Sequence, residues 1–287
     1  MTFQVAATPA LTDPTDQVLC TGSTTAAVSL VATPSATTTF AWTNSRTSIG
    51  LAASGTGNIA AFTATNYTNA PVTATVVVTP TNTESAGGTT VACVGPTQSF
   101  TYTVNPIPTV NTVADQNVCA GTAVTLPFSG FVAGTVFEWT NSNTAIGLAA
   151  SGTGNLSYTA TNTTSSPITA TIIVTPKYTN AGVTCTGNPI SFTITVNPTP
   201  TVAAVTNQVL CNGAATTAVA FTGATTGTVY NWTNSNTSIG LAASGTGDIA
   251  SFTAVNTGAT AATATITVTP TYTGAGFTCT GTATTFT

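Results

Sequence analysis

FAWTNSRTSIGLAASGTGNIAAFTATN, at residues 40–66, is the stretch that decides the fold, because close copies of it stand at residues 137–162 and 230–256. One tryptophan marks the same phase in every copy, and the successive tryptophans are 97 and 93 residues apart. That period is too long for a small solenoid unit and fits one immunoglobulin-like sandwich domain. The 287 residues are therefore predicted to form three tandem domains, although length alone suggests about two.

Alternation of apolar and polar residues indicates strands in every repeat. Residues 73–80, TATVVVTP, and residues 263–270, TATITVTP, carry apolar side chains at every second position. Such alternation favours a strand with one buried and one solvated face. Clusters of Asn, Gly, Ser and Pro separate these runs, and no window holds a helical period. The predicted class is all-β, a tandem array of three immunoglobulin-like sandwiches.

Paired prolines mark two joints, NPIP at residues 105–108 and NPTP at residues 197–200. Prolines in this arrangement favour stiff, extended backbone. We therefore predict domains at residues 1–104, 105–196 and 197–287, arranged as a rod.

The two ends of the chain fall at the same phase of the repeat. Residues 1–5, MTFQV, match FTYTV at residues 100–104, and the chain stops inside the equivalent strand of the third repeat. The first residues are thus expected to end a preceding repeat, and the last strand is expected to be truncated. Two explanations fit: the chain is a window of a longer array, or a neighbouring subunit completes the broken strand.

Charge is nearly absent, with 2 Lys+Arg, 6 Asp+Glu and no His. Without histidine or a basic patch, the chain lacks the usual general base and any surface for nucleic acid. Among the carboxylates only Asp16 and Asp115 recur in phase, so no acid pair suited to a glycosidase is repeated. We predict no enzyme activity, no cofactor and no metal, with calcium at these two residues as the alternative. No apolar run approaches the ~18 to 20 residues of a spanning helix.

Six cysteines fall two per repeat, the second always seven residues before the phenylalanine of the last strand. One structural disulfide within each repeat, at a domain edge, is the predicted pairing, and it implies an oxidising compartment. A metal site is the weaker alternative, because there is no His and no CxxC pair. The predicted pairs are Cys20 with Cys93, Cys119 with Cys185, and Cys211 with Cys279.

Two further features recur in every repeat. Trp42, Trp139 and Trp232 are predicted to be core aromatics, with an exposed platform for sugar stacking as the alternative. The SGTG segments at residues 54–57, 151–154 and 244–247 resemble phosphate-binding loops only superficially, because no GxGxxG or GK[ST] motif completes them. Turns that use glycines with positive φ are predicted there.

The block WTNSNTSIGLAASGTGDIASFTAVN at residues 232–256, TATITVTPTYTGAGFTCTG at residues 263–281 and the joint FTITVNPTPTV at residues 192–202 carry a family resemblance. The sequence resembles the PKD-like immunoglobulin-fold repeats of very large surface proteins of gliding and related Bacteroidota, over essentially its whole length. This resemblance implies export by the type IX secretion system and a place at the cell surface. It supplies no catalytic or ligand residues.

The sequence therefore predicts a stalk or filament segment of a bacterial surface adhesin, which projects a distal contact site and bears force, with gliding motility implied by the resemblance. One alternative is an array of carbohydrate-binding modules, with Tyr67, Tyr178 and Tyr272 as candidate aromatics. Another is a self-assembling extracellular filament subunit joined by exchange of terminal strands. The expected partners are neighbouring repeats of the same chain, with surface polysaccharide as a ligand and O-glycans on threonine.

Overall fold

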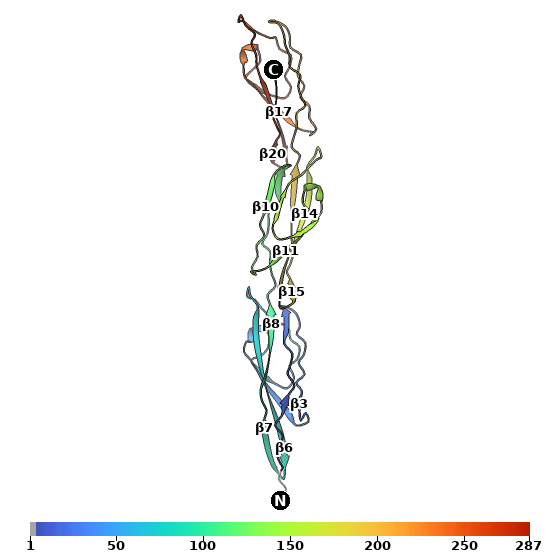
Figure 1. The fold of residues 1–287 in the computed structure, drawn as a ribbon, viewed down its shortest axis with the longest axis vertical. Helices are drawn as coiled ribbons and strands as arrows, with labels where there is room; N and C mark the ends of the chain where they lie inside the picture. The colour runs from blue at the N-terminus through green and yellow to red at the C-terminus, as the bar shows by residue number, and fades with distance from the viewer. Residues whose placement is uncertain (1–3) are drawn as a thin grey trace. The chain divides into compact units, whose positions relative to one another are not determined.

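A computed structural model describes residues 4–287, and these residues form an all-β fold (Figure 1). The predicted class is thereby confirmed. The only helical turns among the described residues are three short 3-10 helices. Of the predicted strand at residues 1–5, residues 1–3 lie outside the described part, and Gln4 and Val5 belong to no strand. The three 3-10 helices are η1 (Thr47–Ile49), η2 (Thr144–Ile146) and η3 (Thr237–Ile239).

The main sheet of the first repeat places its first strand beside its last. β2 pairs in parallel with β8, and β8, β6 and β4 follow as antiparallel neighbours. The alternating residues of β6 bury one face and leave most of the other face partly exposed. The sheet order is β2 (Gln17–Cys20), β8 (Gln98–Asn105), β6 (Val72–Ala86), β4 (Thr38–Asn44) and β5 (Ser54–Thr56), with β7 (Thr89–Val94) paired to β6.

A smaller second layer closes the sandwich of the first repeat. β1 (Ala10–Leu11) pairs with β3 (Ala32–Thr33), and isolated bridges join Thr24 to Thr63 and Val28 to Ile59. Buried side chains of both layers form one core. Its largest fully buried members are Tyr102, Phe100, Ile49 and Ile59. Burial raises the pKa of Tyr102 to about 12, so its phenol stays neutral inside this core.

The second repeat reproduces this arrangement. Its first strand, β9, again pairs in parallel with its last, β16. The sheet order is β9 (Gln116–Cys119), β16 (Ile190–Asn197), β14 (Ile168–Asn180), β11 (Val136–Asn141) and β12 (Ser151–Thr153), with β15 (Val183–Thr186) paired to β14. The second layer consists of β10 (Ala123–Leu126) and β13 (Leu156–Thr159).

The third repeat has the same centre and a shorter edge. Residues 208–211, the counterpart of β2 and β9, form no strand, and the last strand covers three residues. Bridges join Ala215 to Thr253 and Val219 to Ile249 in its second layer. Its sheet holds β18 (Ser244–Thr246), β17 (Val229–Asn234), β19 (Ile266–Gly274) and β20 (Phe277–Thr280), with β21 (Thr284–Phe286) paired to β19.

The described contacts divide the chain into two compact units. The first comprises Met1–Asn111, Phe128–Glu138 and Thr175–Pro189; the second comprises Thr112–Pro127, Trp139–Val174 and Ile190–Thr287. The hairpin of β14 and β15 therefore has its outer end in the same unit as the first repeat. The predicted domain boundaries at residues 104 and 196 stay predictions.

Candidate functional site: the joints between repeats

Two disulfides join neighbouring repeats, and this corrects the predicted pairing within each repeat. Cys20 of the first repeat bonds to Cys185 of the second, with a Cα to Cα distance of 5.6 Å. Cys119 of the second repeat bonds to Cys279 of the third, at 5.7 Å. Each bond lies wholly within one compact unit. The first cysteine of one repeat thus pairs with the second cysteine of the next.

Strand register explains why pairing within a repeat fails. Cys20 stands opposite Asn105, at the end of the sheet where β6 begins, whereas Cys93 stands opposite Asn82 on the same β6. These levels are about ten residues apart along β6, or about 33 Å. Cysteines whose Cα atoms are more than roughly 7 Å apart cannot be bridged without backbone movement. The predicted pairs Cys20 with Cys93, Cys119 with Cys185, and Cys211 with Cys279 are therefore wrong.

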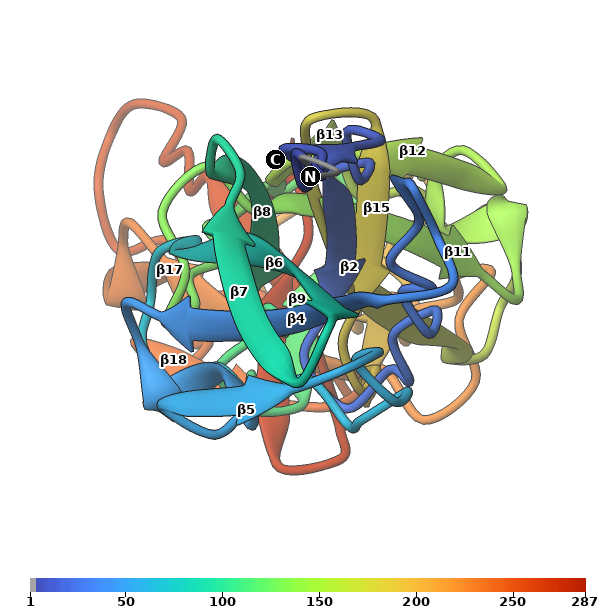
Figure 2. The same ribbon diagram turned by 90° about the horizontal axis from the view of Figure 1, so that it is seen from below.

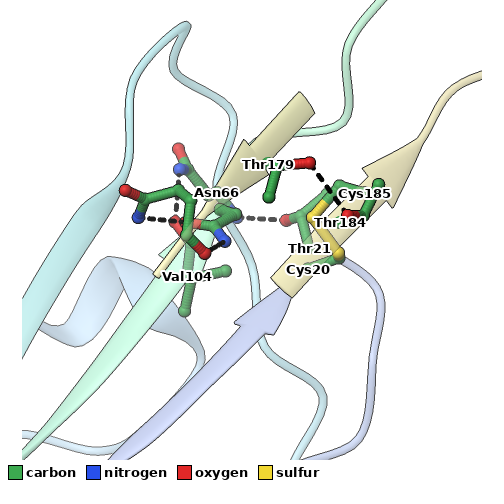
Figure 3. The surroundings of a disulfide bond; sticks show 9 residues. Cys20, Thr21, Asn66, Val104, Thr179, Thr184 and Cys185 are labelled. Atoms are coloured by element: carbon green, nitrogen blue, oxygen red, sulfur yellow. Dashed lines mark hydrogen bonds between the residues drawn. A yellow bond between two sulfur atoms is a disulfide. The ribbon is translucent and has the colours of Figure 1, made fainter. Parts of the chain in front are cut away.

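The hairpin of the second repeat brings Cys185 to the edge of the first. Figure 2 shows β15 beside β2, and Figure 3 shows Cys20 at the end of β2 facing Cys185 on β15. Thr179 and Thr184 share a hydrogen bond across the hairpin, 2.8 Å between their hydroxyl oxygens. This cross-strand pair supports the strands that carry the disulfide.

Near each disulfide, an asparagine side chain donates a hydrogen bond to the last strand of the repeat. The Asn66 side chain donates to the carbonyl of Val104 at 2.8 Å, and its backbone N–H donates to the hydroxyl of Thr21 (Figure 3). Asn162 donates in the same way to Val196 at 2.8 Å. The last strand is thus held in place just before the proline joint.

A glycine in each joint allows the proline segment to lie directly on the hairpin. A Cβ built on Gly187 would stand 1.8 Å from the carbonyl oxygen of Pro108, and one on Gly281 would stand 1.8 Å from that of Pro200. No side chain fits at such a distance. The absence of a Cβ therefore lets the prolines and the hairpin touch.

One polar pair differs between the two joints. Asn105 is fully buried; its side chain accepts from the Asn180 amide at 2.9 Å and donates to the Asn180 carbonyl at 3.3 Å. Asn197 occupies the equivalent place in the second joint and is also fully buried, but neither its amide nitrogen nor its oxygen has a partner. Its neighbour there is Gly274, which has no side chain to offer.

Cys93 and Cys211 are free thiols in this chain, so only four of the six predicted disulfide cysteines are bonded. Cys93 is half-buried, with its sulfur 3.8 Å from the carbonyl oxygen of Ala6, and Cys211 is exposed. Within the sequence they are the counterparts of Cys185 and Cys119.

The three tryptophans are 7 to 8% exposed and lie in the sandwich cores. A glycine of each SGTG segment forms the contact: a Cβ on Gly55 would stand 2.2 Å from the ring of Trp42, with the same arrangement at Trp139 and Trp232. The second glycine of each segment, such as Gly57 with a φ of 68°, forms the predicted turn. Only the tertiary contact explains why the first must also be glycine.

The in-phase carboxylates accept hydrogen bonds from backbone N–H groups. Asp16 accepts the N–H of Thr101 and Asp115 that of Thr193, each at 2.6 Å. The bond from the Thr193 backbone lowers the pKa of Asp115. Among residues 4–287, no group of three or more His, Cys, Asp or Glu side chains is placed to hold a metal ion.

The structure adds an ion pair and shows where the three candidate tyrosines lie. Lys177 forms an ion pair with Glu138 at 2.5 Å. Tyr67 is 87% exposed in a loop, whereas Tyr178 and Tyr272 lie half-buried on hairpins opposite bonded cysteines. No helix in the described part of the chain has the length and apolar character to cross a membrane.

No protein-family model matches the chain, and no curated protein matches it. Solved structures with tandem domains match over nearly its whole length. Sidekick-1 immunoglobulin domains 1-5 match at 13% identity and a TM-score of 0.39, covering 99% of this chain and 59% of that one. The human Desmocollin-1 ectodomain matches at 10% identity and 0.33, covering 97% and 61%.

The chicken CNTN1 FN1-FN3 domains match at 10% identity and a TM-score of 0.30, covering 96% of this chain and 98% of that one. The chain spans about three fifths of the length of the Sidekick-1 and Desmocollin-1 structures. Because these scores are low, the assignment of immunoglobulin-like sandwiches rests on the strand order and register described above.

Proposed function

We propose that the chain is a structural segment of an extracellular bacterial surface adhesin: a stalk or filament that holds a distal contact site away from the cell and bears the force applied there, including the force of gliding motility. The observation that supports this most directly is the pair of disulfides that cross the joints. A covalent bond at that place keeps neighbouring repeats together when their noncovalent contacts are pulled apart. The proposed role is not enzymatic.

The proposed location is the surface of a bacterial cell, reached by type IX secretion. Disulfides form and persist in oxidising environments, which supports a place outside the cytoplasm. The Bacteroidota setting rests on the resemblance of the repeated block at residues 232–256.

The proposed partners are further repeats of a longer chain, a surface polysaccharide, and O-glycans attached to threonine. Rows of paired hydroxyls on exposed faces support the last point. Thr73 and Thr103 approach to 3.0 Å between their hydroxyl oxygens, as do Thr169 and Thr195. With 3% charged residues, these hydroxyls supply much of the polar surface.

Stretching a single molecule by its two ends tests the mechanical role. With both disulfides intact, the shortest covalent path runs through 20 residues to Cys20, back through 67 residues from Cys185 to Cys119, and through 9 residues from Cys279 to Thr287, which makes 96 residues. At about 3.5 Å per residue, the oxidised chain should stop extending near about 340 Å, and the reduced chain near about 1,000 Å.

Other lengths would contradict this reading. Pairing within each repeat would leave about 80 residues in the path and an oxidised length of about 280 Å. Equal lengths with and without reductant would show that the disulfides bear no load.

Small-angle scattering of the chain in solution should give a maximum dimension on the order of 100 Å. A radius of gyration of about 19 Å, typical of a compact chain of this length, would contradict the stalk.

A further inference from the structure

One segment of the sandwich is almost unchanged in all three repeats. Residues 47–57, TSIGLAASGTG, return as TAIGLAASGTG at residues 144–154 and as TSIGLAASGTG at residues 237–247. The copies differ at one position, where the second repeat has Ala145 in place of Ser48. The identity therefore covers buried and exposed positions alike.

Core packing explains the buried positions and leaves the exposed ones unexplained. Ile49 and Leu51 lie in the core, and Gly55 makes room for the ring of Trp42. Four other residues of the segment face solvent in every copy, so core packing does not account for them. They are Ala52, Ala53, Ser54 and Thr56, then Ala149, Ala150, Ser151 and Thr153, and then Ala242, Ala243, Ser244 and Thr246.

An exposed position next to the segment does change between repeats. Ala41 stands opposite Thr56 on the neighbouring strand, and the same position holds Glu138 in the second repeat and Asn231 in the third. Exposed residues that stay the same while their neighbours vary point to binding. We therefore expect the exposed residues of this segment to have a common partner in every repeat.

The exposed residues form an unpaired edge of the main sheet. β5, β12 and β18 are the outermost strands in the sheet order of their repeats. The Ala53 carbonyl accepts an N–H of β4, and the Gly57 N–H donates to a carbonyl of β4. Because bonded residues alternate along an antiparallel ladder, the backbone groups of Ser54 and Thr56 point away from β4. Each edge thus exposes two N–H and two C=O groups to an additional strand.

A buried asparagine holds the residues that lead into each edge. The side chain of Asn44 donates to the carbonyl of Leu51 at 3.0 Å and to that of Ala52 at 3.2 Å. Asn141 and Asn234 make the same two bonds with the equivalent residues. An edge fixed in this way loses little conformational freedom when a strand pairs with it.

Shortness is the main feature of this edge that limits pairing. Native proteins also block sheet edges with charged side chains and prolines. Residues 47–57 contain neither, and the same is true of residues 144–154 and 237–247. The small side chains of the segment let another backbone approach closely.

The edge is complementary to itself. In an antiparallel pair with Gly55 opposite Gly55 of a second copy, Ser54 exchanges both backbone hydrogen bonds with Thr56, and their hydroxyls stand side by side. The chain already contains such a pair, because the hydroxyl oxygens of Ser85 and Thr90 approach to 3.0 Å across β6 and β7. A strand of different sequence would find no charge and no side-chain pocket on this edge to select it.

We propose that copies of this chain associate side by side through these edges: β5, β12 or β18 of one copy pairs in antiparallel orientation with one of these strands on a second copy. The inference rests on the proposed stalk or filament and deepens it, because lateral pairing gathers stalks into a bundle. One edge of three residues binds weakly, and the three edges of each chain strengthen the association.

Analytical ultracentrifugation measures the association. The background for all samples is Cys93→Ser with Cys211→Ser, so that oxidation of the free thiols does not join copies. In this background the sedimentation coefficient should rise with protein concentration, and the rise gives a dissociation constant.

Prolines at the outward N–H groups test the edge itself. Thr56→Pro, Thr153→Pro and Thr246→Pro together remove one outward donor from every edge. Proline is tolerated on an edge strand where the N–H faces solvent, so the bonds to the neighbouring strand remain. This triple variant should raise the dissociation constant at least about tenfold. The matched control places valine at the same three positions, keeps the N–H groups, and should raise it by less than about threefold.

The indole of Trp42 reports whether the fold survives the prolines, because its ring lies against Gly55 in the edge strand. The near-UV circular dichroism of the triple variant should match that of the background. If the signal is lost, lysine at the same three positions replaces proline. Lysine keeps every backbone N–H and adds like charges to both edges, so the same tenfold loss of about one decade in affinity is expected.

Amide hydrogen exchange locates the contact. In the monomer the amides of Ser54 and Thr56 should exchange rapidly, because they donate to solvent. Association should slow them by about tenfold or more. The amide of Gly57 is the internal control, because it already donates to Phe40 and should exchange at the same rate in both states.

Three results would overturn the proposal. A chain that stays monomeric up to about 1 mM would exclude the association. Equal losses from the proline and valine variants would show that the outward N–H groups are not used. Association without slower exchange at Thr56 would place the contact elsewhere. The stretching experiment uses one molecule at a time, so failure of lateral pairing and failure of the stalk are distinguishable.

Discussion

The first joint, around Cys20 and Cys185, and the second, around Cys119 and Cys279, use the same backbone plan with different polar chemistry. In both, the residue after the cysteine donates its backbone N–H to a buried asparagine carbonyl at 2.9 Å. In the first, the asparagine side chain is satisfied by Asn180; in the second, it faces Gly274 and has no partner. Both joints share the disulfide and the strand register, and only the first has the hydrogen-bonded asparagine pair. We therefore expect the disulfide and the register to define the joint, and the asparagine pair to change its stability.

Removing a disulfide should have the largest effect and should be nearly equal at the two joints. Cys185→Ser and Cys279→Ser open loops of 165 and 160 residues. Loop entropy puts each loss at about 5 kcal/mol. Hydrogen exchange of β15 and β20 in the respective variants should show the loss. Reductant added to the original chain should reproduce both effects, and a clear inequality would mean that noncovalent contacts carry one joint.

Truncating the buried asparagine should separate the joints. Asn105→Ala leaves the amide of Asn180 without its partner and should destabilise the first joint by about 1–3 kcal/mol. Asn197→Ala removes two buried atoms that have no partner, so it should be neutral or stabilising. Denaturant midpoints of the two variants provide the measurement. Equal losses would show that the Asn105–Asn180 pair contributes nothing specific.

The substitution Asn180→Gly tests the same difference between the joints, because it places in the first joint the residue type that Gly274 supplies in the second. In this background, Asn105→Ala should cost much less than in the original chain, because the partner is already gone. A coupling energy of about 1 kcal/mol or more between the two substitutions is expected. Additive losses would show that the two side chains act independently.

Relieving the hairpin turns should have a smaller and equal effect in both joints. Ala181 and Ala275 occupy the left-handed region, with φ of 46° and 49°. Side chains with a Cβ are disfavoured there, so Ala181→Gly and Ala275→Gly should each stabilise the hairpin by about 1 kcal/mol. Gly182→Ala, one residue further at a φ of 78°, should destabilise it. Thermal unfolding measures all three, and opposite signs for the two Ala→Gly variants would contradict the shared turn geometry.

Acid should destabilise the sheet edge at Asp115 in the second repeat and leave the equivalent edge of the third repeat unchanged. The backbone N–H of Thr193 lowers the pKa of Asp115, so this contact contributes stability above the carboxyl's ordinary pKa and loses it as pH falls through the lowered value. The counterpart in the third repeat is Asn207, which accepts the N–H of Thr287 at 2.8 Å and does not titrate.

Amide NMR shifts provide the measurement. The Thr193 signal should move between about pH 5 and pH 2, and the Thr287 signal should stay in place. Asp115→Asn should abolish the movement at Thr193 and serves as the control. An equal movement at both amides would assign the acid effect to a wider change in the sheet.

Three features were readable without coordinates: the three repeats, the all-β class and the alternation of β6 and β19. They are local, because each depends on spacing within one segment and on which face of a strand is apolar. The glycine turns were readable for the same reason, since a positive φ is a property of a few adjacent residues. The need for Gly55 was not, because that glycine makes room for an indole from another strand.

The sequence by itself determined where the cysteines fall, and only the tertiary structure decided their partners. Cysteine count and spacing are the same for pairing within a repeat and pairing across a joint. Register separates the two cysteines of one repeat by about 33 Å and brings those of neighbouring repeats together. Long-range contacts of this kind depend on how strands are placed in space, which no single segment encodes.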